Sequence, residues 1–204
     1  MPLKFFDRFK KRPKTNAEII EEWERKGKPA PPPHAIKQKA IKYYKSISGY
    51  DILVETGTFR GDMVEAQSKN FKQIFSIELG EDLWKKAVER FKLQDHITIL
   101  QGDSGKVLGD VVRQLRSPAI FWLDGHYSAG ETAKGDKDCP IFEEIDAIFS
   151  NNKMDHILLV DDARCFIGKG DYPTVETLTA YIKSKDDNYT AKVKDDIICY
   201  SIKN

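Results

Sequence analysis

Acidic residues and glycines gather at a few points of this 204-residue chain, at spacings that suit ligand binding. Glu55, Gly57, Thr58 and Gly61 form an acidic-x-Gly-x-x-x-Gly segment directly after a short apolar run. Glycines let a backbone turn tightly and pass close to a ligand. Glu55 stands where a carboxylate can hold a cationic group, which suits a phosphate-free ligand that carries an amino acid. A plain turn is the alternative interpretation.

Two more polar positions follow the next apolar runs along the chain. A carboxylate at Glu78 can accept two hydrogen bonds from ribose hydroxyls, and Asp103 with Ser104 lies within reach of an adenine edge. Each position also has a simpler interpretation. Glu78 can serve as an anion ahead of the helix that begins near Glu81, and Asp103 with Ser104 can cap a helix.

Three aspartates follow the remaining apolar runs. Asp124 ends one run, and Asp161 with Asp162 ends another. Carboxylates that converge on one crevice repel each other unless a cation or protons compensate. Ligation by oxygen alone suits Mg²⁺, so the sequence predicts a magnesium site at these three residues. The alternative is that Asp161 or Asp162 caps the next segment and pairs with Arg164.

His126 is the predicted general base, and Asp124 beside it is assigned catalytic and cofactor-binding roles as well. Histidine takes a hydroxyl proton near neutral pH, and a metal-bound hydroxyl is already acidified. A structural or surface role is the alternative for this histidine. Residues 128–138 form a polar loop, and long loops at such an edge are often binding lids. The predicted substrate contacts, for which solvent exposure is the simpler explanation, are Tyr127, Thr132, Lys134 and Arg164.

The elements that must position these residues are short strands and amphipathic helices in alternation. Apolar runs typical of strands buried on both faces are residues 51–55, 73–78, 97–101, 119–124 and 156–161. Helical patterns cover residues 34–47, which hold four lysines, 62–69, 81–91, 104–115, 140–149 and about 174–183. The final runs, 189–193 and 197–202, face each other as a hairpin across Asp195-Asp196. The predicted fold is α/β: a doubly wound, mostly parallel seven-stranded sheet with a C-terminal antiparallel hairpin.

Such a sheet explains why residues far apart in sequence can form one site. Ligands bind beyond the carboxyl ends of parallel strands, where the strand order reverses. Every acidic position above lies at the end of a predicted strand or within two residues after it, so all of them are expected at the same edge.

Charge and length divide the chain into two parts. The length fits one domain. Residues 1–33 are predicted to be a basic arm with a short helix, which the Thr15–Glu18 capping box opens and Gly27 ends, before the proline cluster 29–33. Residues 34–204 form the predicted catalytic domain. Net charge is +8 over residues 1–47 and −7 over the rest, so nucleic acid is an unlikely acceptor for the acidic site.

The cysteines and the hydropathy indicate the compartment. Three cysteines form no C-x-x-C pair, and an odd number cannot close a disulfide framework. The sequence shows neither a signal peptide nor a run long enough to span a membrane. The protein is therefore expected to be cytoplasmic. The sequence does not decide whether it forms a homo-oligomer.

Over roughly residues 34–204, these motifs resemble the class I S-adenosylmethionine (SAM)-dependent methyltransferases. The resemblance implies that Glu55, Gly57 and Gly61 surround the methionine end of SAM, that Glu78 binds the ribose, and that Asp103 with Ser104 binds the adenine. The three aspartates are similar to those of metal-dependent O-methyltransferases, of the catechol type and the macrocin O-methyltransferase type, where Mg²⁺ chelates two neighbouring substrate hydroxyls. The implied activity is Mg²⁺-assisted O-methylation of a small polyol, sugar or catechol-like substrate.

The chain departs from these enzymes at the base. Catechol enzymes carry a lysine three residues after the first aspartate, where this chain has Tyr127. The sugar enzymes carry an aspartate two residues after it, where this chain has His126.

Two other functions stay open. A nicotinamide-dependent oxidoreductase can share the fold, although the sequence lacks the G-x-G-x-x-G fingerprint. The chain can also be a non-catalytic binding protein of methyltransferase fold, whose basic segment Lys4–Lys14 docks on nucleic acid or another anionic surface.

Overall fold

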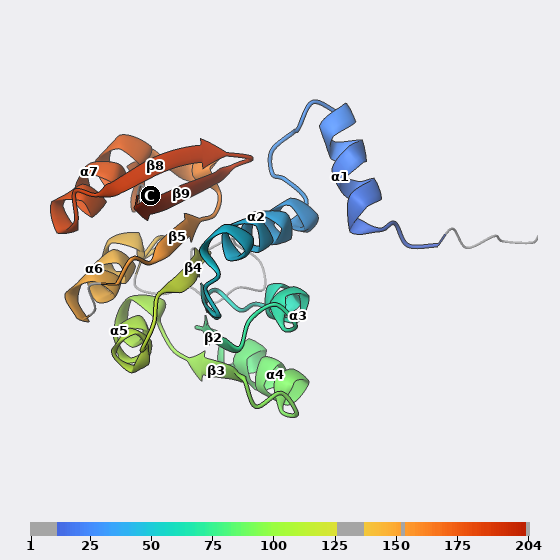
Figure 1. Ribbon diagram of the computed structural model, residues 1–204, viewed down its shortest axis with the longest axis horizontal. Helices are drawn as coiled ribbons and strands as arrows, with labels where there is room; N and C mark the ends of the chain where they lie inside the picture. Colours follow the sequence, from blue (N-terminus) through green and yellow to red (C-terminus); the bar gives the residue numbers. More distant parts are fainter. Residues whose placement is uncertain (1–11, 126–136, 152–153, 203–204) are drawn as a thin grey trace, which may run out of the picture.

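The centre of the protein is a seven-stranded sheet, seen in the computed structural model of Figure 1, which describes residues 12–125, 137–151 and 154–202. The strand order is β3-β2-β1-β4-β5-β9-β8. Strands β1 to β5 are parallel, whereas β9 runs antiparallel to β5 and to β8. This confirms the predicted fold. The strands are β1 (Ile52–Thr56), β2 (Gln73–Glu78), β3 (Ile97–Gln101), β4 (Ala119–Leu123), β5 (Ile157–Val160), β8 (Tyr189–Lys194) and β9 (Ile197–Ile202).

The strand order reverses at β1. This strand pairs with β2 on one side and with β4 on the other, and Thr56 at its end lies opposite both Ile77 and Leu123. The three strands thus end level with each other. In open α/β sheets, the crevice beyond such a switch point is where ligands bind.

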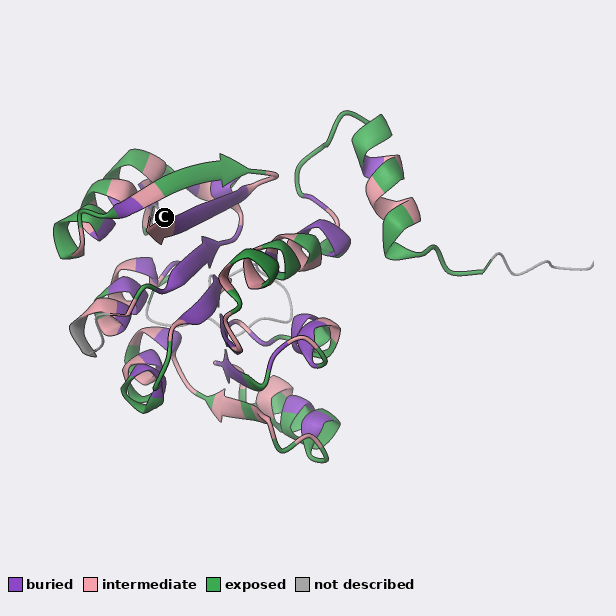
Figure 2. Cartoon of the chain, viewed as in Figure 1, coloured by how far each residue is buried: buried purple, intermediate pink, exposed green. Residues whose placement is uncertain are grey.

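Helices cover both faces of the sheet (Figure 1). They are α1 (Asn16–Arg25), α2 (His34–Ser48), α3 (Asp62–Gln67), α4 (Glu81–Phe91), α5 (Ser104–Gln114), α6 (Ile141–Asn151) and α7 (Val175–Lys185). Successive strand residues point to opposite faces, so Leu53 packs in one core cluster with residues of α2, α3 and α4, while Val54 packs in another with α5, α6 and α7. The central strands are buried on both sides, as Figure 2 shows.

The C-terminal hairpin has the expected two-residue turn. Lys194 pairs with Ile197, and Asp195 and Asp196 between them both have positive φ, 52° and 65°. A turn of this kind matches the twist of the flanking strands and favours Asp, Asn and Gly. The local sequence was therefore sufficient to predict it.

The structure differs from the sequence prediction in three respects. Strand β3 was predicted to be buried on both faces, but it lies at the edge of the sheet and none of its residues is buried. The predicted ends of helix 81–91 match α4, whereas other helix ends differ from the observed ones by up to two residues, a scale on which helix ends fray. The sequence also gave no signal for the 3₁₀ turn η1 (Ala163–Cys165) or for the small hairpin of β6 (Ile167–Lys169) and β7 (Tyr172–Thr174), because three-residue elements are too short for a period.

Helix α1 stands outside the two helical layers (Figure 1). The Thr15 capping box opens it as predicted, and Asn16 donates a hydrogen bond of 2.8 Å to Gln38 on α2. Trp23 is buried, and its indole N–H donates to the Pro29 carbonyl at 2.8 Å. The boundary between arm and domain stays a prediction. No helix in the described part of the chain is both long and apolar enough to cross a membrane.

Candidate active site

Glu55 lies in β1, one residue before its end, and its side chain is buried. Its carboxyl accepts a hydrogen bond of 2.5 Å from the Ser76 hydroxyl, which in turn lies 2.6 Å from the Thr58 hydroxyl. Burial raises the pKa of Glu55 to about 8, opposed by the Ser76 hydrogen bond and reinforced by the charges of Asp124 and Glu78. A cation placed against this group would favour its carboxylate form.

Glycine is favoured at positions 57 and 61 by the backbone conformation and by close neighbours that differ between the two positions. Both have positive φ, 86° and 78°. A Cβ atom on Gly57 would lie 2.3 Å from the backbone oxygen of Asp124, and one on Gly61 would lie 2.7 Å from the Phe91 ring. The close approach expected at these glycines is therefore, in this structure, to another loop and to α4. Contact with a ligand stays a prediction.

Gly57→Ala is expected to destabilise the protein more than Gly49→Ala. Both glycines have positive φ, so each alanine carries backbone strain of about 1–3 kcal/mol. Only at Gly57 does the new methyl group also meet a backbone atom, since nothing lies within 4 Å of a Cβ on Gly49. Urea unfolding of the two variants measures the difference. Equal losses would show that the loop after β4 moves freely away from Gly57.

Glu78 ends β2 and is buried. Its two carboxylate oxygens accept hydrogen bonds from the backbone N–H groups of Phe59, at 2.6 Å, and Gly80, at 2.8 Å. Burial raises the pKa of Glu78, and these backbone donors oppose the rise. The carboxylate thus ties the loop after β1 to the loop after β2, at the point where the ribose interaction is predicted.

Asp103 caps α5. Its side chain accepts from the Gly105 N–H at 3.0 Å, which is the alternative that the sequence left open. Ser104 begins the same helix and is buried. A Cβ atom on Gly125 would lie 2.9 Å from the Ser104 hydroxyl, so this serine lies against the loop after β4. A cap and an adenine contact are compatible, because each carboxylate oxygen has more than one lone pair.

The fold brings together the strand ends that carry the three aspartates. The Asp124 N–H donates to the Thr56 carbonyl at 3.1 Å, and the Asp161 N–H donates to the Leu123 carbonyl at 3.1 Å. Asp161 is fully buried. Asp162 has a left-handed backbone, φ 55°, and accepts from the Arg164 guanidinium at 2.7 Å. The predicted Asp162–Arg164 pair is thus present.

A lysine that sequence reasoning missed binds this cluster. Lys37, in the first turns of α2, donates a hydrogen bond to Asp161 Oδ2, and its ammonium lies 3.7 Å from Asp162 Oδ1. Burial lowers the pKa of Lys37, but attraction to Asp161 and Asp124 outweighs this, so the pKa lies above its ordinary value. Burial raises the pKa of Asp161, and Lys37 opposes that rise.

The arrangement does not fit the predicted magnesium site. The ammonium of Lys37 sits directly on Asp161 and 3.7 Å from Asp162, and the Arg164 guanidinium binds Asp162 at 2.7 Å, so cations of the protein already pair with both residues at the end of β5. Over the described ranges, no three His, Cys, Asp or Glu side chains are grouped to hold a metal ion. The Mg²⁺ prediction is therefore not supported by this geometry, and we derive no chemical step from a metal.

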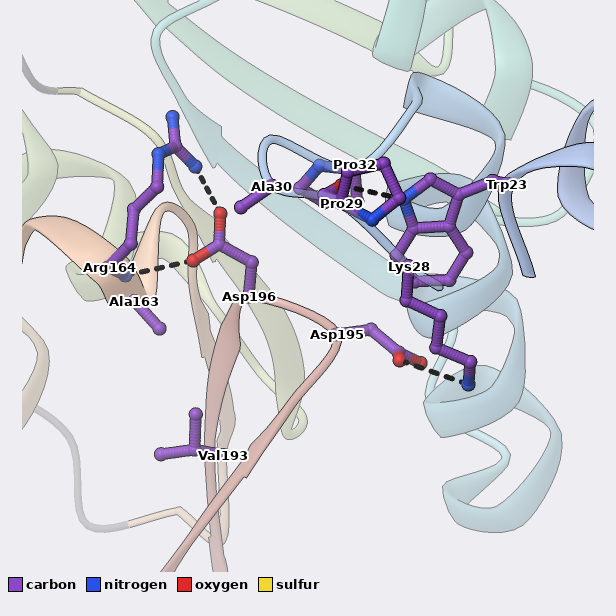
Figure 3. Close-up of a pocket in the computed structure, with 10 residues that line it drawn as sticks. All are labelled: Trp23, Lys28, Pro29, Ala30, Pro32, Ala163, Arg164, Val193, Asp195 and Asp196. Atoms are coloured by element: carbon purple, nitrogen blue, oxygen red, sulfur yellow. Dashed lines mark hydrogen bonds and ion pairs between the residues drawn. The ribbon is translucent and has the colours of Figure 1, made fainter. Parts of the chain in front are cut away.

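Ala163 and Arg164, which follow Asp162 in the chain, line a cavity of about 460 Å³ (Figure 3). The Arg164 guanidinium binds Asp162 and Asp196, and its backbone N–H donates to Asp196 at 2.8 Å. The opposite wall is the arm segment that includes Trp23, and Lys28 from this segment forms an ion pair of 3.6 Å with Asp195. The arm therefore builds part of a cavity that adjoins the strand ends.

Four predicted site residues, His126, Tyr127, Thr132 and Lys134, lie outside the described residues. His34, which had no predicted role, begins α2 and is exposed. Partial desolvation is the main cause of its lowered pKa, and the charges of Asp62, Lys37 and Asp161 also act on it. A described histidine therefore lies within electrostatic range of Asp161.

Comparison with known proteins identifies the fold. Neither protein-family models nor curated protein sequences give a significant match. Among solved structures, the chain is similar to an O-methyltransferase from Bacillus cereus in complex with S-adenosylhomocysteine (SAH), at TM-score 0.61 and 14% identity, covering 94% of this chain and 93% of that one. It is also similar to the O-methyltransferase TomG from Streptomyces achromogenes in complex with SAM, at TM-score 0.60 and 13% identity, covering 92% and 86%.

SAH-bound PaMTH1 of Podospora anserina aligns with TM-score 0.56 and 13% identity, covering 91% of this chain and 88% of that one. These neighbours are methyltransferases rather than nicotinamide oxidoreductases. The chain therefore has the methyltransferase fold, as the sequence predicted. At such low identity, the likeness concerns the fold and leaves the reaction to be argued from the site.

Proposed function

We propose that this protein transfers a methyl group from SAM to a hydroxyl oxygen of a small polyol, sugar or catechol-like acceptor. The observation that carries the proposal is the convergence of Glu55, Glu78 and Asp103 at the ends of β1, β2 and β3, beside the switch point of a methyltransferase fold. A nicotinamide oxidoreductase is not favoured, because the segment from Glu55 in β1 to Gly61 reads acidic-x-Gly-x-x-x-Gly instead of G-x-G-x-x-G.

Each of these residues has a separate task in the proposal. Glu55 binds the amino group of SAM, Glu78 the ribose hydroxyls, and Asp103 with Ser104 the adenine. Thr58 holds the Glu55–Ser76 hydrogen-bond chain in place. A bound SAM supplies an electrophilic methyl group on a sulfonium.

Glu78→Ala is expected to weaken SAH binding by about 1.5–3 kcal/mol, the scale of hydrogen bonds to a charged group. The loss arises because the ribose hydroxyls lose their acceptor. Calorimetric titration of purified protein with SAH measures it.

The matched control for this prediction is Glu81→Ala. Glu81 is an exposed acid in the first turn of α4, where it acts on the helix dipole and pairs with Lys85. Its removal is expected to leave SAH affinity unchanged. If Glu78→Ala also leaves the affinity unchanged and only lowers stability, Glu78 is a structural anion between two loops and has no ribose role.

SAH binding is expected to release up to about one proton from Glu55 at pH 7. With a pKa of about 8, the free protein holds this carboxyl protonated, whereas an ammonium against it requires the carboxylate. Because the folded pKa exceeds the unfolded one, the stability from this group is full below the unfolded pKa and is lost as pH rises through about 8. Titrations in buffers of different ionisation enthalpy count the protons, and Glu55→Gln should abolish their release.

The acceptor side of the crevice suits a hydroxyl. Methyl transfer forms a bond from carbon to the acceptor oxygen while the carbon–sulfur bond breaks, and the electron pair of the broken bond stays on sulfur. The hydroxyl proton must leave, and we assign it to the imidazole of His126. An in-line arrangement of oxygen, methyl carbon and sulfur supplies most of the rate.

We place the acceptor between Asp124, Asp161 and the cavity beside Arg164, with Tyr127, Thr132 and Lys134 as further contacts. The acidic strand ends disfavour a polyphosphate such as nucleic acid, which binds to basic surfaces. A screen of hydroxylated metabolites, scored by SAH release, tests the assignment. Tighter binding of NAD than of SAH would contradict the proposed function.

A further inference from the structure

Lys37 binds a carboxylate that the sequence assigned to Mg²⁺. The residue comes from α2, 124 positions before Asp161 in the chain, and its side chain is only 18% exposed. It donates to one carboxylate oxygen of Asp161, and the other, Oδ1, is buried without a hydrogen bond to any described residue. Asp161, after the end of β5, is therefore a buried carboxylate. One of its oxygens binds an ammonium, and the other has no hydrogen bond to any described residue.

We infer that the Lys37 ammonium takes the place of the divalent cation at the carboxylate cluster of Asp124, Asp161 and Asp162, and that it contacts the acceptor oxygen there. This inference rests on the proposed function, because the cluster is its acceptor site. Methyl transfer by this chain is then independent of Mg²⁺.

The chemistry of an ammonium supports this role. Lysine carries three N–H donors. One is used on Asp161, while Asp162, at 3.7 Å, is an ion-pair partner beyond hydrogen-bond distance. A remaining donor can bind the acceptor oxygen and stabilise negative charge as the hydroxyl proton leaves. The open Oδ1 of Asp161 accepts from a second hydroxyl, which gives two contacts to neighbouring hydroxyls without a metal.

Mg²⁺ would have to displace Lys37 to bind here. Mg²⁺ needs near-octahedral oxygen ligands at about 2.0–2.1 Å. The position of α2 in the fold holds the Lys37 ammonium at the cluster instead. Displacement would leave a buried ammonium next to a divalent ion of the same sign, which is unfavourable.

The test is a titration with Mn²⁺ alone, followed by electron paramagnetic resonance of the free ion. Wild-type protein is expected to bind no Mn²⁺ at this cluster. Lys37→Gln removes the charge and keeps a long polar side chain, and it is expected to raise Mn²⁺ affinity by about tenfold or more, since an uncompensated buried carboxylate is left behind. Lys37→Arg should keep the wild-type behaviour, and Lys37→Gln with Asp161→Asn should lose the gained affinity.

Two results would overturn the inference. One is Mn²⁺ binding by the wild type that Asp161→Asn abolishes, a result that does not depend on whether the Lys37 variants fold. The other is a Lys37→Gln variant that retains SAH binding but gains no Mn²⁺ affinity. SAH titration of the same samples separates this outcome from failure of the proposed function, which would appear as absence of SAH binding in the wild type.

Discussion

His126→Ala is expected to lower kcat by about 10²–10⁴-fold, the usual contribution of a positioned general base. His126 follows Asp124 by two residues in the sequence. The wild-type rate should rise with pH through a single ionisation in the histidine range, because the imidazole must be neutral to take the proton. SAH affinity should stay unchanged, since the histidine acts on the acceptor side.

His34→Ala is the matched control for this experiment. His34 also senses the charge of Asp161, but it begins α2 and pairs with Gln38 at 2.8 Å. We expect its removal to leave kcat within about threefold of the wild type, a scale below that of general-base loss. If the large effect follows His34 instead, that residue is the base. A near-native rate in both variants would point to Tyr127 or to bulk water.

The features predicted from sequence are those with a local cause. Apolar runs marked the five parallel strands, and the turn at Asp195–Asp196 was visible as two acidic residues between two β-rich runs. The helix cap at Thr15 could be predicted from the four residues Thr15–Glu18. Each of these depends on neighbours in the chain, and the sequence contains all of the information needed.

The chemistry at the end of β5 was only partly predictable. Asp161 and Asp162 are adjacent, and the sequence treated them as one pair. The fold separates them: Asp161 is buried against Lys37, whereas Asp162 adopts a left-handed backbone and binds Arg164. Which of two adjacent carboxylates points inward depends on backbone angles that composition does not report.

No pattern in the sequence indicated that Lys37 belongs to the site. It is one of four lysines in a helical pattern, and in an amphipathic helix such residues usually face solvent. The contact with Asp161 exists because α2 packs across the face of the sheet near β4. Only the three-dimensional arrangement reveals that the positive charge expected from a metal is supplied by the protein itself.

The contribution of the Lys37–Asp161 ion pair to the free energy of unfolding can be measured in the absence of an acceptor. Lys37→Met is expected to lower the free energy of unfolding by about 3–5 kcal/mol, because it leaves the buried Asp161 carboxylate without its partner. Asp161→Leu should cost less, since the Lys37 side chain keeps 18% exposure and Asp162 stays 3.7 Å away. The double variant Lys37→Met with Asp161→Leu should recover to within about 1 kcal/mol of wild type, as apolar replacements of buried ion pairs often do. Urea unfolding of the four proteins completes the cycle. A loss below about 1 kcal/mol for Lys37→Met, the value of a surface pair, would mean that water reaches Asp161 and that the lysine is not needed to neutralise it.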